Sequence, residues 1–167
     1  MFAFNARLQL QTLVETREIP IRDFYLGPGK VNLKPGELLT SIKFYPEDYI
    51  DFSGHYIKFA MRKAMDIATL GVSVLCKLEN KRTFKEARIA LGVAGPTPIR
   101  CEIAEEYAKG KEVTLETLTE IGKYALKSAN PRTSWRASKE YREHPIQVLT
   151  QRALLVAIKR AGGEDLA

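Results

Sequence analysis

The residues best suited to chemistry lie in a short cationic stretch near the middle of the chain. Residues 58–66 contain Lys58, Arg62, Lys63 and Asp66, at the point where one extended pattern ends and another begins. A turn of this composition can present cations and one acid to a planar, electron-accepting ligand. The alternative is a charged hairpin turn with no ligand, and the residues by themselves favour that alternative.

The sequence contains no other pattern that would indicate a catalytic or metal site. His55 and His144 have no partner at catalytic or ligand spacing and are interpreted as surface or loop histidines. Cys76 and Cys101 have no CxxC spacing, so zinc or iron–sulfur ligation within this chain is not expected, and Cys76 is predicted to be a buried, reduced thiol. No paired carboxylates, GxSxG, P-loop or GxGxxG motif occurs. The sequence therefore predicts no catalytic residue and no metal ligand.

The composition is that of an ordinary water-soluble domain with a basic balance. Of the 167 residues, 45% are hydrophobic and 28% charged, and the net charge is +6. The basic residues are scattered and no nucleic-acid motif is present, which favours solvated faces over an acidic partner or a bound phosphate. There is no long apolar stretch and no signal-peptide pattern, so a reducing, cytoplasmic location away from membranes is expected.

The first third of the chain is predicted to be extended. Residues 7–14 and 19–22 indicate a hairpin, residues 27–30 a Gly/Pro loop, and residues 37–45 a strand that follows a turn at 35–36. A hairpin or two cannot bury enough surface to be stable alone. This segment is therefore expected to depend on a neighbour.

From residue 56 the pattern changes to an antiparallel meander. Strands are predicted at residues 56–61, 69–78 and 84–93, with a turn at 79–82. Two sets of apolar residues alternate along the last two strands and are predicted to face one core: Leu70, Val72, Val74, Cys76 and Leu78, and then Ala87, Ile89, Leu91 and Val93.

The remainder is predicted to be helical. A first helix runs from residue 97 or 98 to about 109, a second begins at a Thr114 cap and ends before Asn130, and a third spans 138–160. Pro145 lies inside the third helix, which is either kinked there, the favoured alternative, or begins near it. The predicted fold class is α+β: a three-stranded antiparallel sheet with helices packed on one face, preceded by the hairpin segment.

Five stretches, in the same order along the chain, resemble the FAD-binding subunits of xanthine-dehydrogenase-type molybdenum hydroxylases. Residues 58–68 match the pattern K-x-A-x-R-x-A-x-D-I-A, and similar agreement occurs at residues 24–30, 35–42, 92–100 and 134–142. Each motif is weak by itself, but their order is difficult to obtain by accident. The resemblance covers nearly the whole chain.

The resemblance implies an organisation and a set of cofactor contacts. Residues 1–52 would be a remnant of the second FAD-binding subdomain, and residues 53–167 the C-terminal α+β domain of the flavin subunit. The positions of Leu39 and Lys58 would contact FAD, and Arg62 would belong to a loop bordering the isoalloxazine ring. The two glycine-rich stretches that hold the FAD pyrophosphate in the family do not occur in these residues, so this chain would contain an incomplete FAD site.

The resemblance also implies partners and an activity. Subunits carrying iron–sulfur clusters and molybdopterin would supply electrons, which would pass through FAD to NAD. The chain would act as part of an oxidoreductase complex and be inactive alone; a stand-alone binding or scaffold module without redox activity is the alternative. Without the rest of the FAD domain, Phe2, Phe4, Leu8 and Leu10 are expected to expose apolar area, which would favour a homo-oligomer.

Overall fold

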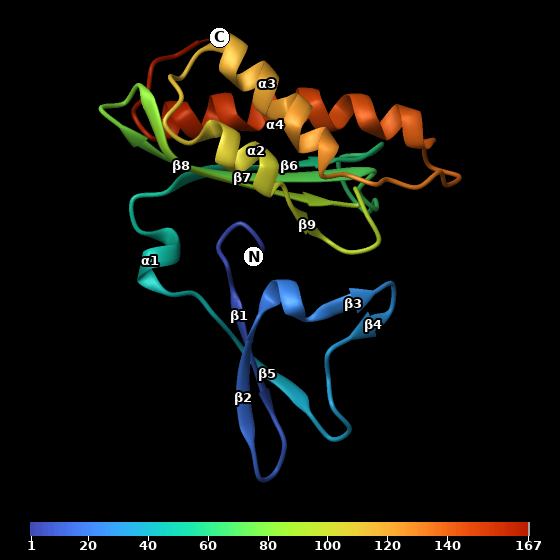
Figure 1. Cartoon of the computed structure of the whole chain (residues 1–167). Coiled ribbons are helices and arrows are strands. Elements are labelled where there is room, and N and C mark those ends of the chain that lie inside the picture. The colour runs from blue at the N-terminus through green and yellow to red at the C-terminus, as the bar shows by residue number, and fades with distance from the viewer. Residues whose placement is uncertain (167) are drawn as a thin grey trace.

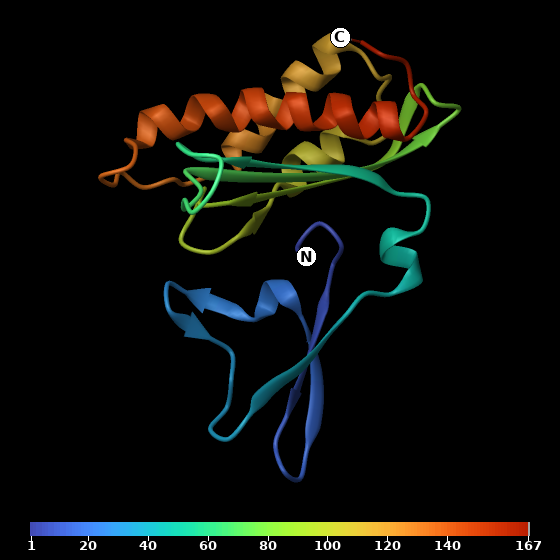
Figure 2. The same ribbon diagram turned by 180° about the vertical axis from the view of Figure 1, so that it is seen from behind.

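The computed structural model describes residues 1–166 and consists of two stacked parts (Figure 1). The chain begins at the junction between them, forms the lower part, and then enters the upper sheet at β6. The helices of the second half cover the face of the upper sheet that points away from the lower part, as the view from behind also shows (Figure 2). The predicted α+β class is confirmed.

The lower part is built from short antiparallel strands. Its three-stranded sheet has the order β2-β1-β5, and β3 and β4 form a separate two-stranded hairpin. The elements are β1 (Arg7–Gln11), β2 (Thr16–Pro20), the 3-10 helix η1 (Ile21–Asp23), β3 (Tyr25–Gly27), β4 (Lys30–Val31), β5 (Leu38–Lys43) and α1 (Pro46–Tyr49). The predicted loop and strand are present, and so is the hairpin, although its second strand spans Thr16–Pro20 and Ile21 and Arg22 belong to η1.

The expected exposure of apolar residues in this part is partly wrong. Leu8 and Leu10 are buried, because β1 is the central strand and its inner face packs on Ile21 and Phe24. Phe2 and Phe4 are half-buried against the upper sheet. Other residues expose apolar area instead: Leu13, Val14, Leu26, Leu38, Leu39 and Ile42. Self-association of the chain stays a prediction and now depends on this second set.

The upper sheet contains the predicted meander and one strand more. Its order is β6-β7-β8-β9, all antiparallel. The strands are β6 (Ser53–Phe59), β7 (Leu70–Glu79), β8 (Thr83–Gly92) and β9 (Ile99–Arg100). The short β9 occupies residues predicted to begin a helix, since Ile99 pairs with Leu91 and the backbone N–H of Cys101 donates to Ile89 at 2.8 Å.

Val93 does not face the core as predicted. Strand β8 ends at Gly92, and Val93 has a φ of 65° and is 43% exposed. A β-branched residue in the left-handed region is rare, because its Cβ substituents crowd the backbone. The chain turns here toward β9, and the alternation of the strand ends one residue earlier than the sequence indicates.

Three helices cover one face of the upper sheet. They are α2 (Glu102–Ala108), α3 (Leu115–Lys127) and α4 (Lys139–Arg160). Thr114 and Ser138 cap α3 and α4 by accepting from the backbone N–H groups of Thr117 and Tyr141. Helix α4 continues through Pro145, so a start near that residue is wrong. The largest fully buried side chains of this core are Phe84, Leu70, Ile89, Leu91, Leu118, Ile121, Ile146, Leu154 and Ile158.

The opposite face of the upper sheet contacts the lower part. Ala3 packs on Leu75 and Ala90, which point away from the helices. Arg88, 7% exposed, pairs with Asp48 at 3.2 Å. Further toward β9, Arg100 donates to the Asn5 side chain at 2.6 Å, and pairs with Glu105 of α2 at 2.7 Å. The two parts are thus joined by apolar contacts and by buried cations of the upper sheet.

A close approach of α3 and α4 at Gly122 yields a prediction. A Cβ at Gly122 would lie 2.8 Å from the carbonyl oxygen of Gln147 in α4, and that backbone cannot move without shifting the helix. We expect Gly122→Ala to lower the free energy of unfolding by about 1–3 kcal/mol, although alanine is the better helix former. Denaturant unfolding measures this, with Lys123→Ala on the exposed face of α3 as the control. Equal or higher stability of Gly122→Ala would contradict the packing.

Candidate functional site

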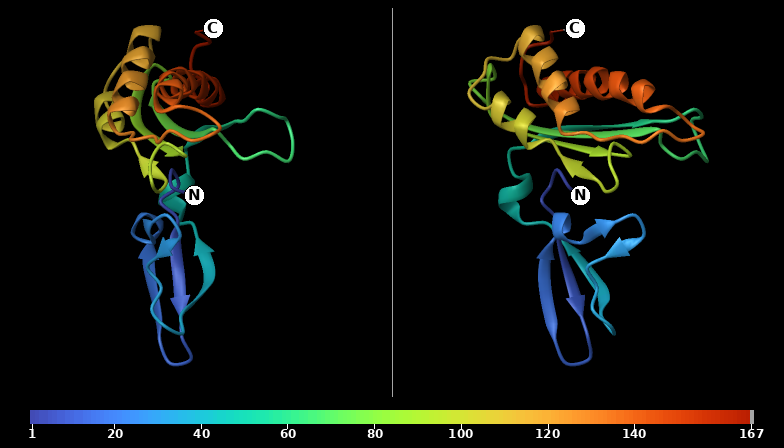
Figure 3. Two further views of the ribbon diagram at one scale, coloured as in Figure 1. Left: turned by 90° about the vertical axis from the view of Figure 1, so that its right-hand side faces the viewer. Right: turned by 45° about the vertical axis from the view of Figure 1, so that its right-hand side comes forward.

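The cationic stretch forms a turn at one end of the upper sheet. It connects β6 to β7, and the backbone N–H of Thr69 closes its base by donating to Phe59 at 2.8 Å. Thr69 and the following Leu70 are buried, whereas Met61, Arg62 and most other residues of the turn are exposed. In the left view of Figure 3 the turn projects from the body of the molecule. We refer to residues 58–69, from Lys58 at the end of β6 to Thr69, as the cationic turn.

Asp66 organises the cationic turn through its carboxylate. One carboxylate oxygen accepts from the backbone N–H groups of Met61 at 2.8 Å and Arg62 at 3.0 Å. The Arg62 N–H is the main reason why the pKa of Asp66 lies below its ordinary value of 3.8, and partial burial opposes that shift. The single acid of this stretch therefore holds the turn together from within, and its charge is solvated by backbone donors.

The two predicted cofactor contacts in the turn are held by carbonyl groups. Lys58 Nζ donates to the backbone oxygen of Asp66 at 2.7 Å, and the Arg62 guanidinium donates to the backbone oxygen of Met65 at 2.7 Å. Both side chains are exposed. Because a carbonyl accepts a hydrogen bond without cancelling the charge, the turn presents positively charged groups at defined positions.

Leu39 lies in the other part of the molecule. It is on β5 opposite Leu10 and is 42% exposed. Figures 1 and 3 show β5 in the lower sheet and the cationic turn at the end of the upper sheet. The structure thus brings Lys58 and Arg62 into one turn but does not bring Leu39 into contact with them.

Two hollows of the structure were not predicted, and one of them borders the cationic turn. One of about 410 Å³ lies between the turn and the start of α4, where Met61, Thr69, Arg136 and Tyr141 contribute to its wall. Sequence reasoning missed it because its walls come from segments far apart in the chain. The motif at residues 134–142 could have pointed to this hollow, because it includes the wall that lies opposite the cationic turn.

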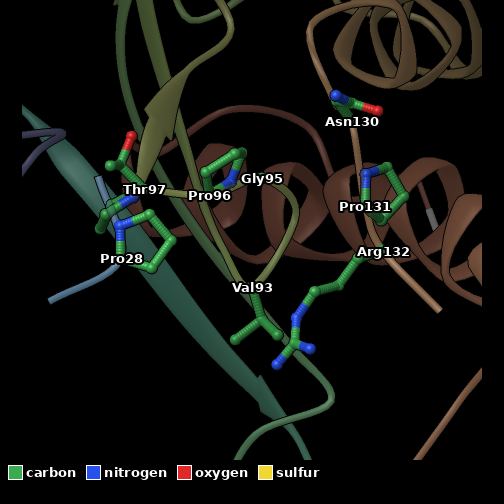
Figure 4. A pocket seen from close by; sticks show the side chains of 9 residues that line it. Pro28, Val93, Gly95, Pro96, Thr97, Asn130, Pro131 and Arg132 are labelled. Atoms are coloured by element: carbon green, nitrogen blue, oxygen red, sulfur yellow. The ribbon is translucent and has the colours of Figure 1, made fainter. Parts of the chain in front are cut away.

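The other hollow has a volume of about 700 Å³ and lies between the β8–β9 connection and the segment after α3. Its walls are mostly proline and small side chains: Pro28, Val93, Gly95, Pro96, Thr97, Pro98, Asn130, Pro131 and Arg132. Figure 4 shows the Arg132 guanidinium next to Val93 on one side, with Pro28 and Thr97 on the other. An apolar wall with one cation suits a ligand that has both a flat and an anionic portion.

The cysteines and histidines lie away from these hollows. Cys76 and Cys101 are buried, which raises the pKa of each thiol to about 12 and leaves it protonated and unreactive. His144 is exposed on α4, as predicted. His55 differs, because it is half-buried in β6, where burial lowers its pKa.

Comparison with known proteins identifies the family. A model described as the CO dehydrogenase flavoprotein C-terminal domain matches residues 55–157, more than half of the 167 residues. The chain belongs to this family. The match begins in β6 and ends in α4, so it includes nearly all of the meander, the cationic turn, α2 and α3, and α4 as far as residue 157.

Individual relatives confirm the resemblance found in the sequence. The xanthine dehydrogenase FAD-binding subunit of Escherichia coli O157:H7 is 42% identical over 161 residues, which are 96% of this chain and 55% of the relative. A glyceraldehyde dehydrogenase medium chain of Sulfolobus acidocaldarius is 27% identical over 151 residues, 90% of this chain and 52% of the relative. The chain spans about half the length of the curated relatives it matches.

Solved structures agree on the fold. The carbon monoxide dehydrogenase of Hydrogenophaga pseudoflava matches 95% of this chain and 54% of its own, with a TM-score of 0.86 and 27% identity. The reconstituted CO dehydrogenase of Oligotropha carboxidovorans gives a TM-score of 0.86 and 27% identity over 96% of this chain and 55% of its own. Both comparisons extend beyond the flavoprotein C-terminal domain into the lower part.

The hydrogen bonds of Asp66 predict a pH response of the cationic turn. Because the folded pKa of this group is lowered, the order it provides is complete above its unfolded value of 3.8 and is lost as the pH falls through the folded pKa. We expect the amide proton shifts of Met61 and Arg62 in NMR spectra to move together in that range. Asp66→Asn should abolish the joint transition and Glu47→Gln should not. Retention of the transition in Asp66→Asn would contradict the assignment.

Proposed function

We propose that this chain is the C-terminal portion of the FAD subunit of a xanthine-dehydrogenase-like oxidoreductase, which relays electrons from iron–sulfur clusters through FAD to NAD. The observation that carries the proposal is 42% identity to a xanthine dehydrogenase FAD-binding subunit over 96% of the chain. Within this assignment, residues 1–52 are a remnant of the second FAD-binding subdomain and residues 53–167 are the C-terminal domain.

The residues of the chain suit one side of a flavin site. Lys58 and Arg62 are exposed and cationic, and Leu39 offers an exposed apolar surface on β5. These are suitable groups for the polar edge and the flat face of the isoalloxazine ring. They lie in different sheets, and the 167 residues contain no glycine-rich pyrophosphate loop, so the rest of the cofactor must be bound by other residues.

The cationic turn acts on the cofactor through its electric field. When bound, FAD supplies the two-electron redox chemistry that links one-electron clusters to NAD. A cation near the ring favours the reduced state, because that state carries more negative charge, and the effect is on the order of a few kcal/mol at most at a partly solvated site. The hydrogen bond from Lys58 Nζ to the backbone carbonyl of Asp66 fixes the position of the Lys58 ammonium group.

The remaining parts of the proposal concern partners and location. Subunits carrying iron–sulfur clusters and molybdopterin supply the electrons, and the hollow beside Arg132 offers an open surface for the dinucleotide acceptor. Among residues 1–166 no helix is long and apolar enough to cross a membrane. We propose a cytoplasmic location. The comparisons do not favour the alternative of a stand-alone binding or scaffold module.

Replacing Lys58 in the assembled enzyme tests the flavin contact. Lys58→Met keeps the aliphatic stem and removes the charge, so we expect a lower flavin reduction potential and slower reduction of NAD. If the reduced flavin loses about 1.4 kcal/mol of stabilisation, its reduction potential falls by about 30 mV for a two-electron couple. Redox titration of the flavin measures the shift. Arg62→Ala should act in the same direction but less, since water can replace an exposed guanidinium.

The controls separate this effect from a loss of folding. Lys63→Met removes an exposed charge from the same turn and should shift the potential less than Lys58→Met. Oxidation of the reducing substrate with an acceptor that takes electrons before the flavin should be largely unaffected by Lys58→Met. Equal loss of both activities would show that Lys58 only maintains the fold, and the proposed contact would be wrong.

A second prediction concerns cofactor binding by the 167 residues alone. Because the contacts of this chain cover only one side of the ring, we expect the purified chain to retain little or no FAD. Absorbance in the flavin bands after purification with added FAD measures this directly. A stoichiometric yellow protein would show that these residues suffice for tight binding.

A further inference from the structure

Arg142 is a buried arginine whose contacts lead out of its own helix. It lies in the first turn of α4 and is 2% exposed. One terminal nitrogen donates to the backbone oxygen of Thr69 at 2.5 Å, and the other donates to Ser134 Oγ at 2.8 Å. A single side chain therefore connects the start of α4, the base of the cationic turn and the segment that precedes α4.

Among the residues that the structure describes, no acid pairs with the charge of Arg142. Within residues 1–166 no carboxylate forms an ion pair with it, and its Nε is buried without a hydrogen-bond partner. Burial, followed by the charges of Arg132 and Arg136, lowers its pKa. Burying an unpaired guanidinium is costly, and an apolar side chain could fill the same space at lower cost. Core packing alone thus does not explain an arginine here.

The contact with Thr69 places Arg142 at the base of the cationic turn. The N–H of Thr69 pairs with Phe59 and closes the turn, and the carbonyl of the same residue accepts from Arg142. Lys58 is adjacent to Phe59 on β6 and reaches across the turn to Asp66. A displacement of the base would therefore move the ammonium group of Lys58.

The contact with Ser134 links a second turn to the first. Residues 134–137 are closed by backbone bonds between Ser134 and Ala137 at 2.9 and 3.2 Å, and Ser134 Oγ also accepts from the Arg136 N–H at 3.3 Å. This second turn contributes Arg136 and Ala137 to the hollow of about 410 Å³, and the cationic turn contributes Met61 and Thr69. Arg142 thus holds both walls of that hollow together.

We propose that Arg142 is a positioning residue that fastens the base of the cationic turn to the turn at 134–137 and so fixes where Lys58 and Arg62 present their charges. The effect on the cofactor rests on the proposed function, because it assumes that Lys58 lies beside the flavin. The effect on the turn itself does not depend on that assumption.

Hydrogen exchange tests the effect on the turn. In the full chain, Arg142→Met should increase the exchange rates of the Thr69, Met61 and Arg62 amides by about tenfold or more, because local opening exposes them. Amides in the centre of β7 and β8 should change much less. Arg152→Met makes the same substitution at an exposed position of the same helix and should leave the turn unchanged.

Flavin potentials in the assembled enzyme test the effect on the cofactor. Arg142→Lys keeps the charge but cannot reach both acceptors in the same geometry. It should lower the flavin potential in the same direction as Lys58→Met. If Arg142 acts through Lys58, Arg142→Lys should add little to the shift in a Lys58→Met background, whereas a general loss of packing would add fully.

Each outcome of the two experiments decides one of the proposals. Normal exchange in the cationic turn of Arg142→Met, or additive shifts in the double variant, would overturn the positioning role. An unchanged potential in Lys58→Met alone would instead count against the flavin contact and leave the exchange test of Arg142 valid. If Arg142→Met does not fold, the exchange test uses Arg142→Lys and Ser134→Ala. Unchanged amide exchange rates in the cationic turn of both variants would overturn the proposal.

Discussion

Strands β7 and β8 are buried on both faces, and this constraint decides where the other elements can lie. Val74 and Ile89 point into the helical core, whereas Leu75 and Ala90 point to the opposite side and contact Ala3. An antiparallel sheet usually has one solvated face, so covering the second face requires another layer. The first residues of the chain provide that layer, and buried Arg88 supplies a polar connection to Asp48. The lower part is attached to the sheet because its first residues bury the apolar side chains on the second face of β7 and β8.

The sequence predicted elements whose pattern is local. The alternation along β7 and along β8 as far as Leu91, and the Thr114 cap, depend on neighbours in the chain, and the structure contains them. The errors arose where tertiary contacts override local preference. Ile99 and Arg100 extend because β8 has a free edge to pair with, although their spacing suits a helix. Leu8 and Leu10 are buried by Ile21 and Phe24, which follow on a short 3-10 turn that the pattern does not reveal.

The same distinction applies to the candidate site. The cationic turn was predictable, because its charges are grouped in the sequence and residues 58–68 match a family pattern. The internal geometry of the turn was not predictable. Nothing in the pattern indicates that the Asp66 carboxylate accepts from two backbone N–H groups and not from a cation. Arg142 ends the stretch at residues 134–142 that resembles the family, and the sequence indicates no role for it. Its contact with Thr69 joins residues 73 positions apart, which only the packing of α4 on the sheet brings together.

The hydrogen bonds of the cationic turn also explain how it can be ordered and still carry a positive field. Ion pairs from Lys58 and Arg62 to Asp66 would have stabilised the turn and at the same time cancelled much of its potential. Instead the cations donate to the carbonyls of Asp66 and Met65, and the carboxylate accepts from backbone N–H groups. The charged groups of both signs are hydrogen-bonded to the backbone and form no ion pair with one another. Arg142 is buried and is held in the same way, because it donates to the carbonyl of Thr69 and the hydroxyl of Ser134 and, among residues 1–166, to no acid. Under the proposed function, this arrangement lets the cations act on a flavin that gains negative charge on reduction, whereas an ion-paired loop of equal stability would have little effect on it.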